Sequence, residues 1–200
     1  MTKPVRDLAI LTFVTLDGVM QAPAQPDEDV SGGFTRGGWA MPYWEEVMAQ
    51  VGTEAMAEPY DLLLGRKTYE LFARHFTSAE GDQAHLLNQA RKYVASNTLD
   101  GLAWNNLVAV SGDIAAEVGR LKAQDGPLLQ VHGSWQLILT LLANNLVDEF
   151  QLWTFPFIVG PGKRLFGETS GRPGLKLVKS GRTAKGFVMS IYRLAEPSGL

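Results

Sequence analysis

A run of apolar and β-branched residues near the start of the chain limits the fold more than any other feature. Residues 8–16 read LAILTFVTL and end at Asp17-Gly18. Because the apolar residues are continuous rather than alternating with polar ones, the pattern is typical of a strand buried on both faces. We therefore expect this segment to be a central strand of a sheet.

Helical and strand patterns alternate along the rest of the chain. Tyr43, Val47, Val51 and Ala55 fall four apart, which predicts an amphipathic helix over 42–57. Further strands are expected at 60–64, 91–95, 107–110, 128–131, 148–155, 175–180 and 186–192, with helices beginning near Thr68, after 111–113 and after 133–134. This order predicts an α/β fold with a mostly parallel sheet and an antiparallel C-terminal hairpin. We find no internal repeat or linker, so residues 1–200 are expected to form one domain.

Residues 21–38 interrupt this alternation. They are rich in proline, glycine and acidic residues and have no hydrophobic period. A loop of this length in a compact domain is often a lid or a binding loop, and we expect that role here.

Composition excludes several classes of protein. The chain has no cysteine and three histidines, so neither a thiolate site nor a histidine-based metal site is expected. A net charge of −3 argues against a nucleic-acid binder. The apolar run at 8–16 is too short to span a membrane. We expect a cytoplasmic protein that contacts neither nucleic acid nor membrane.

Charge is divided unevenly along the sequence. Residues 1–60 hold nine acids and three bases (−6), whereas residues 61–200 hold twelve acids and fifteen bases (+3). A modest positive field over the later segment suits a small anionic ligand, although random scatter of surface charge explains the difference equally well.

Three predicted strand-to-helix junctions combine glycine and hydroxyl residues. They are Gly65-Arg66-Lys67-Thr68, Ser96-Asn97-Thr98 and Gly133-Ser134. Ligands of parallel sheets bind at the carboxyl ends of strands, where helix N-termini favour anions. Together with the cationic pair Arg66 and Lys67, these junctions suit a phosphorylated dinucleotide. Each junction alone is equally explained as ordinary turn and capping chemistry.

Better-known nucleotide and hydrolase signatures are missing. The chain has no Gly-x-Gly-x-x-Gly after the first strand, no P-loop and no Gly-x-Ser-x-Gly. The glycine-rich stretch 160–167 lacks the Ser/Thr of a phosphate loop, and we interpret it as a turn.

An ordered set of segments nevertheless resembles a known family. The segments are TLDG at 15–18, LGRKTYE at 64–70, KYVASNTL at 92–99, LVDE at 146–149, FP at 155–156 and GPGKRLF at 160–166. In this order they are similar to the dihydrofolate-reductase-like superfamily, in particular the branch related to the C-terminal reductase domain of the bacterial riboflavin-biosynthesis deaminase/reductase. The resemblance covers about residues 7–194.

This resemblance implies a three-layer α/β/α sandwich that binds NADPH. It assigns Gly65, Arg66, Lys67 and Thr68 to the adenosine phosphates, with Arg66 and Lys67 near the 2′-phosphate. It also assigns Ser96 and Asn97 to the adenosine end, Gly133 and Ser134 to the pyrophosphate, and the loop from Thr15 to Gly18 to the nicotinamide. The sequence departs from the family pattern at His132-Gly133-Ser134-Trp135, where the reductases have a fuller glycine run, and at Asn97.

The substrate half of the site rests on fewer residues. Trp39, Tyr43 and Trp44 could stack on a flat heterocycle, or else pack a lid or a dimer contact. Dihydrofolate reductase is similar in placing a carboxylate on its first helix, for which the candidates are Glu45 and Glu46. Both could equally be solvated helix-start residues.

Two residues at strand ends complete the candidates. Asp17 is the candidate catalytic residue, orienting substrate or water, unless it only makes a turn. We interpret His132 as a hydrogen-bonded strand-end residue.

The resemblance favours an NADPH-dependent reductase of a small conjugated heterocycle or imine, pterin-like or pyrimidinone-like. A non-catalytic NADPH-binding or sensing protein is the alternative, and a flavin-using reductase is a third. The look-alike domains and the exposed late hairpin favour a homodimer.

Overall fold

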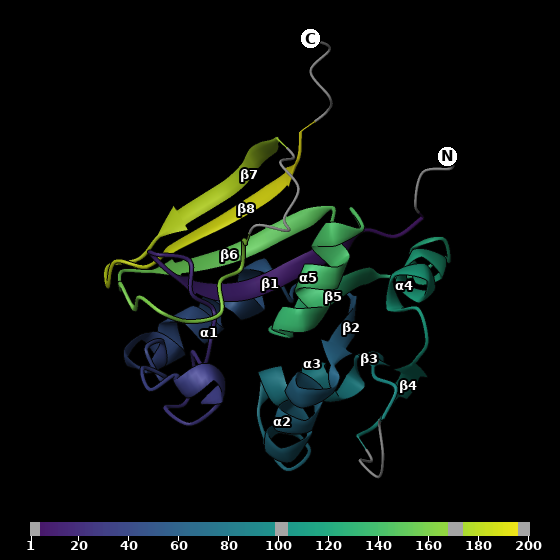
Figure 1. Cartoon of the computed structure of the whole chain (residues 1–200), viewed down its shortest axis with the longest axis horizontal. Helices are drawn as coiled ribbons and strands as arrows, with labels where there is room; N and C mark the ends of the chain where they lie inside the picture. The colour runs from purple at the N-terminus through teal and green to yellow at the C-terminus, as the bar shows by residue number, and fades with distance from the viewer. Residues whose placement is uncertain (1–4, 99–103, 168–173, 196–200) are drawn as a thin grey trace.

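In the computed structural model the chain forms an eight-stranded sheet with helices on both faces. The structure describes residues 5–98, 104–167 and 174–195. The strands lie in the order β4-β3-β2-β5-β1-β6-β8-β7 (Figure 1). Their bounds are β1 Leu8–Thr15, β2 Tyr60–Gly65, β3 Lys92–Ala95, β4 Leu107–Val110, β5 Leu128–His132, β6 Glu149–Phe155, β7 Leu175–Arg182 and β8 Val188–Leu194. The first six in this row run parallel, and β8 pairs antiparallel with both β6 and β7.

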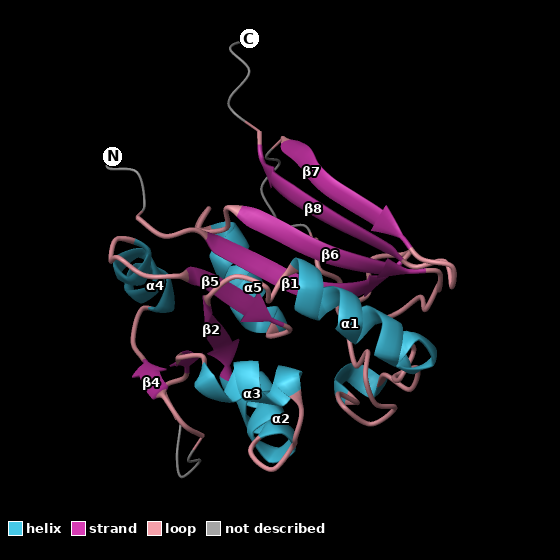
Figure 2. Cartoon of the chain, turned by 180° about the vertical axis from the view of Figure 1, so that it is seen from behind, coloured by secondary structure: helices cyan, strands magenta, loops and turns pink. Residues whose placement is uncertain are grey.

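The helices divide between the two faces. They are α1 Trp44–Glu54, α2 Arg66–Phe76, α3 Asp82–Gln89, α4 Ile114–Lys122 and α5 Trp135–Ala143. One buried cluster holds side chains of α1, α2 and α3, and a second, on the other face, holds those of α4 and α5. In Figure 1 helix α5 lies in front of the sheet. In Figure 2, which views the molecule from the opposite side, α1 lies in front of the sheet. The predicted α/β/α sandwich with an antiparallel C-terminal hairpin is thus confirmed.

Burial explains why β1 could be recognised from sequence. Leu8, Ala9 and Ile10 are fully buried, and β1 lies between β5 and β6 in the middle of the row. A strand covered on both faces has no polar side to alternate with. The observed strands agree with the predicted ones to within two residues at each end.

Helix α3 was not predicted. Its eight residues, DQAHLLNQ, bury only Ala84 and Leu87. Two apolar contacts in two turns give too weak a periodic signal to separate a short helix from a polar connection.

The segment expected to be a lid is packed against the body of the protein. It contains one short 3₁₀ turn, Ser31–Gly33. The buried Gln21 holds it together, because its amide nitrogen donates to the carbonyls of Asp29 and Ser31 and its amide oxygen accepts from the Lys163 N–H, each at 3.0 Å. The indole nitrogen of Trp39 donates to the Gln21 carbonyl at 2.9 Å. These contacts fix the loop in place.

Parallel strands give the sheet two chemically different edges. We call the carboxyl edge the side at which β1, β2, β3, β5 and β6 end, and the amino edge the side at which they begin. Helices α2 and α5 begin at the carboxyl edge, directly after β2 and β5. The positive ends of their dipoles therefore lie at this edge.

Candidate functional site

The central strand β1 extends beyond its neighbour β5 at the carboxyl edge. Leu11 lies opposite His132, where β5 ends, whereas the pairing with β6 continues to Thr15 opposite Phe155. Past His132 the chain turns away at Gly133 and Ser134, whose φ values are +51° and +61°. Two successive residues in this left-handed conformation reverse the chain sharply. The last residues of β1 are therefore left without a strand neighbour on this side.

The peptide groups of Phe13 face this open side. The Leu129 N–H donates to the Asp7 carbonyl and the Asp148 N–H to the Leu8 carbonyl, at 3.0 and 2.9 Å. Because successive peptide groups of a strand point to opposite sides, odd-numbered residues of β1 face β5 and even-numbered residues face β6. The Phe13 N–H and C=O thus point to where β5 has already ended. The Thr12 hydroxyl donates to the Phe13 carbonyl at 3.3 Å, so the N–H and the second lone pair of this carbonyl are available there for a ligand.

Two of the predicted junctions lie in direct contact. The Gly65 N–H donates to the Ser134 hydroxyl at 2.9 Å, and the Ser134 N–H donates to the Thr68 hydroxyl at 3.1 Å. A Cβ added at Gly65 or Gly133 would lie 3.5 Å from Ser134 or Thr68. These bonds bring the starts of α2 and α5 together, and they also use the Ser134 N–H that the resemblance assigned to a pyrophosphate.

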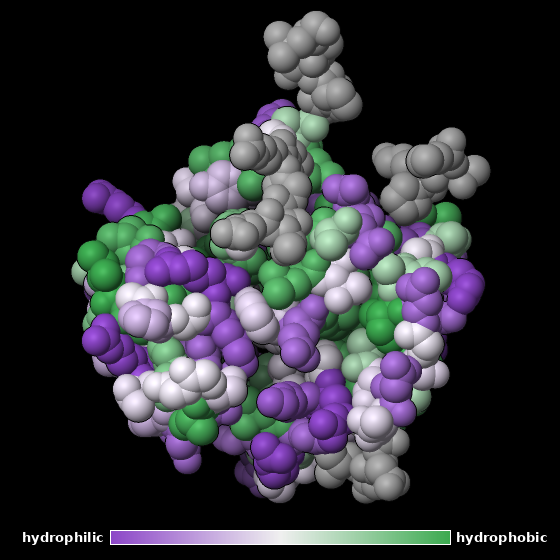
Figure 3. All heavy atoms as spheres, viewed as in Figure 1, coloured by the Kyte–Doolittle hydropathy of each residue, from purple (hydrophilic) through white to green (hydrophobic). Residues whose placement is uncertain are grey.

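Arg66 and Lys67 lie in the first turn of α2 and are exposed. The Arg66 guanidinium is 3.4 Å from the Glu70 carboxylate one turn along the helix, an exposed pair that holds it weakly. Figure 3 shows a hydrophilic surface around this part of the molecule and a recess near its centre, between α5 and α2 of Figure 1.

The third junction lies farther along the same edge. The Asn97 side chain accepts from the Gly112 N–H at 2.8 Å, and the Ser96 hydroxyl accepts from the Thr98 N–H at 3.1 Å. β3 adjoins β2 in register, with Ala95 opposite Gly65. Ser96 and Asn97 therefore follow Gly65 along the carboxyl edge. Leu99, the last residue of the 92–99 motif, lies outside the described residues.

Asp17 makes a dense set of contacts. Its carboxylate accepts from the Thr15 hydroxyl at 2.6 Å and from the N–H groups of Val159 and Gly160 at 3.2 and 2.8 Å. The Thr15 hydroxyl and these backbone N–H groups lower the pKa of Asp17 to about 2. Asp17 is therefore ionised at neutral pH and holds the loop after β6 against the end of β1. Its catalytic role stays a prediction.

Arg164 and Trp135 border the site, although sequence analysis did not select them. Arg164 donates to the backbone carbonyls of Asp17 and Gly160, and the Trp135 indole donates to the Arg164 carbonyl at 2.9 Å. Trp135 is the first residue of α5. From sequence the 160–167 segment was interpreted as a plain turn. Its packing against β1 and α5 shows that it also brings Arg164 to the site.

The aromatic residues expected to stack on substrate pack on phenylalanine rings of the protein. Trp39 is buried against Phe155, with ring centroids 5.4 Å apart. Tyr43 contacts the same ring at 5.4 Å, whereas Trp44 contacts Phe13 edge to face at 6.0 Å. The half-buried members, which we call the aromatic patch, are Phe13, Tyr43, Trp44 and Phe157. Sequence analysis missed Phe13 because it is part of a strand that otherwise reads as buried core.

Glu45 and Glu46 lie in the first turn of α1, where Glu45 is exposed and Glu46 is half-buried. Met48, one helical turn after Trp44, is also half-buried and packs against the same core.

His132 is enclosed at the end of β5, as expected for a hydrogen-bonded strand-end residue. Its Nε2 lies 3.0 Å from the Gln130 side-chain oxygen, and the Tyr60 ring stacks on it. Burial lowers the pKa of His132 to about 4, so the imidazole is neutral at pH 7.

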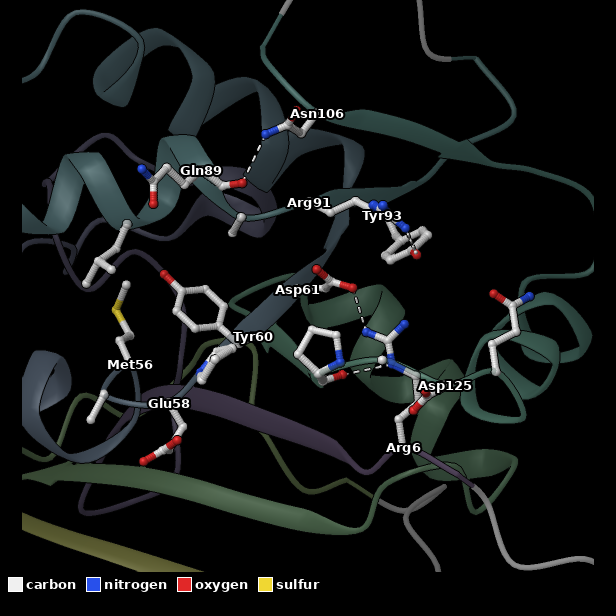
Figure 4. Close-up of a pocket in the computed structure, with 17 residues that line it drawn as sticks. Arg6, Met56, Glu58, Tyr60, Asp61, Gln89, Arg91, Tyr93, Asn106 and Asp125 are labelled. Carbon is white, nitrogen blue, oxygen red and sulfur yellow. Dashed lines mark hydrogen bonds and ion pairs between the residues drawn. The ribbon is translucent and has the colours of Figure 1, made fainter.

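A cavity of about 780 Å³ lies at the opposite, amino edge (Figure 4). Its walls include the ion pair between Arg6 and Asp61, 2.7 Å apart and almost entirely buried. Figure 4 shows these two side chains pointing toward each other. None of the residues selected from sequence lines this cavity.

The described ranges 5–98, 104–167 and 174–195 contain no group of three or more His, Asp or Glu side chains that could hold a metal ion. None of their helices has the length and hydropathy needed to cross a membrane.

Comparison with protein families gives one matching model. Residues 6–189 match the model of the RibD C-terminal domain. A relative in Bacillus subtilis strain 168, the uncharacterised protein YyaP, is 31% identical over 136 residues, which cover 66% of this chain and 72% of the relative.

Three solved structures illustrate the fold that this chain shares. A putative riboflavin biosynthesis protein from Shewanella sp. PV-4 is 18% identical with a TM-score of 0.64, covering 95% of this chain and 99% of that one. Dihydrofolate reductase from Enterococcus faecalis, complexed with NADP(H) and RAB-propyl, is 13% identical with a TM-score of 0.60 and covers 95% and 97%. A pyrimidine reductase-like protein from Corynebacterium diphtheriae is 11% identical with a TM-score of 0.59 and covers 96% and 92%.

Proposed function

The chain belongs to the RibD C-terminal domain family, and from that premise we propose that it is an NADPH-dependent reductase. Its substrate would be a small conjugated heterocycle or imine, pterin-like or pyrimidinone-like, which accepts a hydride. The observation that carries the proposal is the Phe13 N–H and C=O, which have no strand partner and lie beside the joined starts of α2 and α5. We propose that one domain over residues 1–200 performs this reaction.

The carboxyl edge fits a phosphorylated dinucleotide. The N–H groups in the first turns of α2 and α5 have no partner within their helices and favour anions. Thr68 and Gly133 would hold the diphosphate through their backbone. Gly65 and Ser134, whose N–H groups already donate to the Ser134 and Thr68 hydroxyls, would shape the turns around it. Arg66 and Lys67 would bind the 2′-phosphate, since both are exposed at the start of α2. Ser96 and Asn97 would contact the adenosine end.

The reduced ring fits the open side of β1. A carboxamide carries one donor group and one acceptor, which match the C=O and N–H of Phe13. Thr15 and Gly18 would border the ring at the end of the strand. The NADP(H) present in the similar Enterococcus enzyme supports this choice of cofactor.

The acceptor would lie on the aromatic patch, against Tyr43 and Trp44, with Trp39 beneath it and Glu45 at the rim. When bound, NADPH would supply the hydride, and the residues of the chain would orient the acceptor and exclude water. Asp17 would keep the end of β1 and the following loop in place. Its low pKa makes it a positioning residue rather than a proton donor at neutral pH.

We also propose a cytoplasmic homodimer that pairs through β7. This outermost strand is exposed along almost its whole length. Leu177 and Val178 are 49% and 55% exposed, and an open edge with apolar side chains is a template for pairing. Sedimentation should give a dimer, and Leu177→Lys should give monomers.

Fluorescence titration with NADPH and NADH tests the cofactor. We expect clear preference for NADPH, and equal binding of the two would contradict the proposal. Stopped-flow mixing of the NADPH complex with pterins and pyrimidinone ribosides then separates a reductase from a non-catalytic NADPH-binding protein. Absence of oxidation with every acceptor favours the binding protein, and a yellow purified protein favours a flavin enzyme.

A further inference from the structure

His132 is the last residue of β5 and lies beside the open side of β1. It stands opposite Leu11, and the next residue of β1 on the same face is Phe13, for which β5 supplies no neighbour. The His132 ring contacts Phe72 of α2, with centroids 6.1 Å apart, and stacks on Tyr60. Because both rings belong to the cluster that also holds Leu11 and Phe13, the imidazole rises from the sheet on the same face as the Phe13 ring.

A row of buried amides connects His132 to a carboxylate. The His132 Nε2 lies 3.0 Å from the Gln130 side-chain oxygen. The Gln130 amide nitrogen donates to the Ala55 carbonyl at the end of α1, and also to the Gln151 side-chain oxygen at 3.3 Å. The Gln151 amide nitrogen in turn donates to the Glu149 carboxylate at 2.7 Å. All four side chains in this row are buried, so their hydrogen bonds are sheltered from water.

This row decides which nitrogen of His132 carries the proton. The Ala55 carbonyl can only accept a hydrogen bond, and so can the Glu149 carboxylate, which is paired with Arg193. These two groups therefore turn the amide nitrogens toward themselves. The Gln130 oxygen is left to face His132, and this oxygen also only accepts. The proton of the neutral imidazole is therefore on Nε2, and Nδ1 carries a lone pair.

The Nδ1 atom of His132 has no partner in the protein. Within the described part of the chain no group forms a hydrogen bond with it, and only the Tyr60 hydroxyl is both fully enclosed and unpaired, so Nδ1 keeps contact with the surface. The two nitrogens lie on different flanks of the imidazole. Because Nε2 turns back toward Gln130, Nδ1 is directed to the side on which β5 ends. Burial lowers the pKa of His132 to about 4, so this lone pair is present at neutral pH.

We infer that His132 is a specificity-determining residue of the site, whose Nδ1 accepts a hydrogen bond from an N–H or NH₂ group on the substrate ring. This inference rests on the proposed function and deepens it. A ring that lies against Phe13 occupies the position beside His132 where β5 would have continued. A ring donor facing the lone pair gains a partner, whereas a ring atom that can only accept meets repulsion. Gln130 and Glu149 are positioning residues, because they act through the tautomer of His132.

Nitrogen NMR of the native chain tests the tautomer without turnover. The chain has three histidines, so labelling histidine with nitrogen-15 gives few signals, and His75→Gln and His85→Gln, at exposed positions, identify the others. We expect His132 to show a protonated Nε2 and an unprotonated Nδ1 at pH 7. Gln130→Met removes the partner of Nε2 and should release this tautomer, and an unchanged tautomer would contradict the role of Gln130. A His132 protonated on Nδ1 in the native chain would overturn the inference, whether or not the protein is a reductase.

Matched substrates test the contact itself. Dihydropterin is compared with analogues that carry a methyl group in place of the 2-amino group, or on N3 or N8, so that each lacks one N–H donor. With NADPH saturating, we expect kcat/KM for one analogue to be lower by about tenfold or more. In His132→Phe, which keeps a ring against Phe72, this loss should largely disappear, and in the control His85→Phe it should persist. Equal losses in His132→Phe and the control would overturn the inference while leaving the reductase proposal intact.

Binding separates the inference from the proposed reaction. Quenching of tryptophan fluorescence in the NADPH complex gives Kd for dihydropterin and for each analogue. If none is reduced but one analogue loses affinity in the native chain and not in His132→Phe, the reductase proposal fails and the His132 contact stands. If no ring binds, or if dihydropterin and all its analogues bind equally to the native chain, the inference fails.

Discussion

The two edges of the sheet differ in how their polar groups are used. At the amino edge the charged groups Arg6 and Asp61 in the wall of a wide cavity already pair with each other, although the buried Tyr60 hydroxyl there has no partner among the described residues. At the carboxyl edge, by contrast, the Phe13 peptide and the first turns of α2 and α5 lack strand or helix partners. Available donors and acceptors, rather than the volume of a hollow, therefore indicate where a ligand is recognised.

A buried lysine near the amino edge also has its partners within the protein. Lys92 is fully buried, donates to the Asn88 carbonyl at 2.7 Å and lies over the Trp104 ring. Burial lowers the pKa of Lys92 to about 8. Lys92 begins β3 and is enclosed by Asn88 of α3 and by Trp104, so its role is structural.

Breaking the amino-edge pair should have the largest effect. Arg6→Met leaves the Asp61 carboxylate buried without its partner, and we expect a loss of about 3–5 kcal/mol in the free energy of unfolding, measured with urea. Arg120→Met, which breaks the exposed pair with Glu117, should cost no more than about 1 kcal/mol. NADPH affinity of folded Arg6→Met should be unchanged, and a weakened affinity would show that the two edges are coupled.

At the carboxyl edge, Arg66→Ala should change binding rather than stability. We expect NADPH affinity to fall by about 1–3 kcal/mol, because a charge-assisted phosphate contact is lost. NADH affinity should scarcely change. Arg74→Ala, at the far end of α2, is the control by fluorescence titration. Equal losses for both cofactors would mean that Arg66 does not meet the 2′-phosphate.

A smaller effect of opposite sign is expected from Tyr60→Phe at the amino edge. The Tyr60 hydroxyl is buried and has no hydrogen-bond partner within the described part of the chain. Its removal should raise the free energy of unfolding by about 1 kcal/mol. Tyr69→Phe should lower the free energy of unfolding, because the Tyr69 hydroxyl accepts a hydrogen bond from the backbone N–H of Trp104 at 3.1 Å. A destabilised Tyr60→Phe would reveal a partner for the hydroxyl, such as a buried water.

The last predicted effect depends on pH and concerns Asp17. Its pKa of about 2 lies below the ordinary value of 3.8, so its stabilising contacts are complete above pH 3.8 and are lost as the pH falls toward 2. The difference in unfolding free energy between the native chain and Asp17→Asn should shrink over this window. Asp27→Asn, an exposed change in the same loop region, should show no such trend. A difference that stays constant down to pH 2 would contradict the assigned contacts.

Sequence patterns located most of the fold because each signal was local. β1 was recognised by a continuous apolar run, and α4 by the Asp113 cap, whose carboxylate accepts from the Ala116 N–H at 3.1 Å. Helix α3 escaped detection because only two of its residues are buried. One of the contacts that fix the 21–38 segment comes from Lys163, more than a hundred residues away, so no local pattern could reveal it.

The candidate site divides in the same way. Gly65, Thr68, Gly133 and Ser134 were identified from turn chemistry, and they meet because β2 and β5 are neighbours. Phe13, Arg164 and Trp135 were not identified, because their positions at the site depend on where other segments end or pack.

Hydrophobic period and turn preference act over a few residues, so the strands, most of the helices and the glycine and hydroxyl junctions between them could be predicted from the chain alone. The early end of β5 beside β1, which leaves Phe13 without a strand partner on that side, became visible only in the folded molecule. Strand register and the meeting of distant loops depend on contacts between segments far apart in the chain, and these contacts leave no periodic trace in either segment.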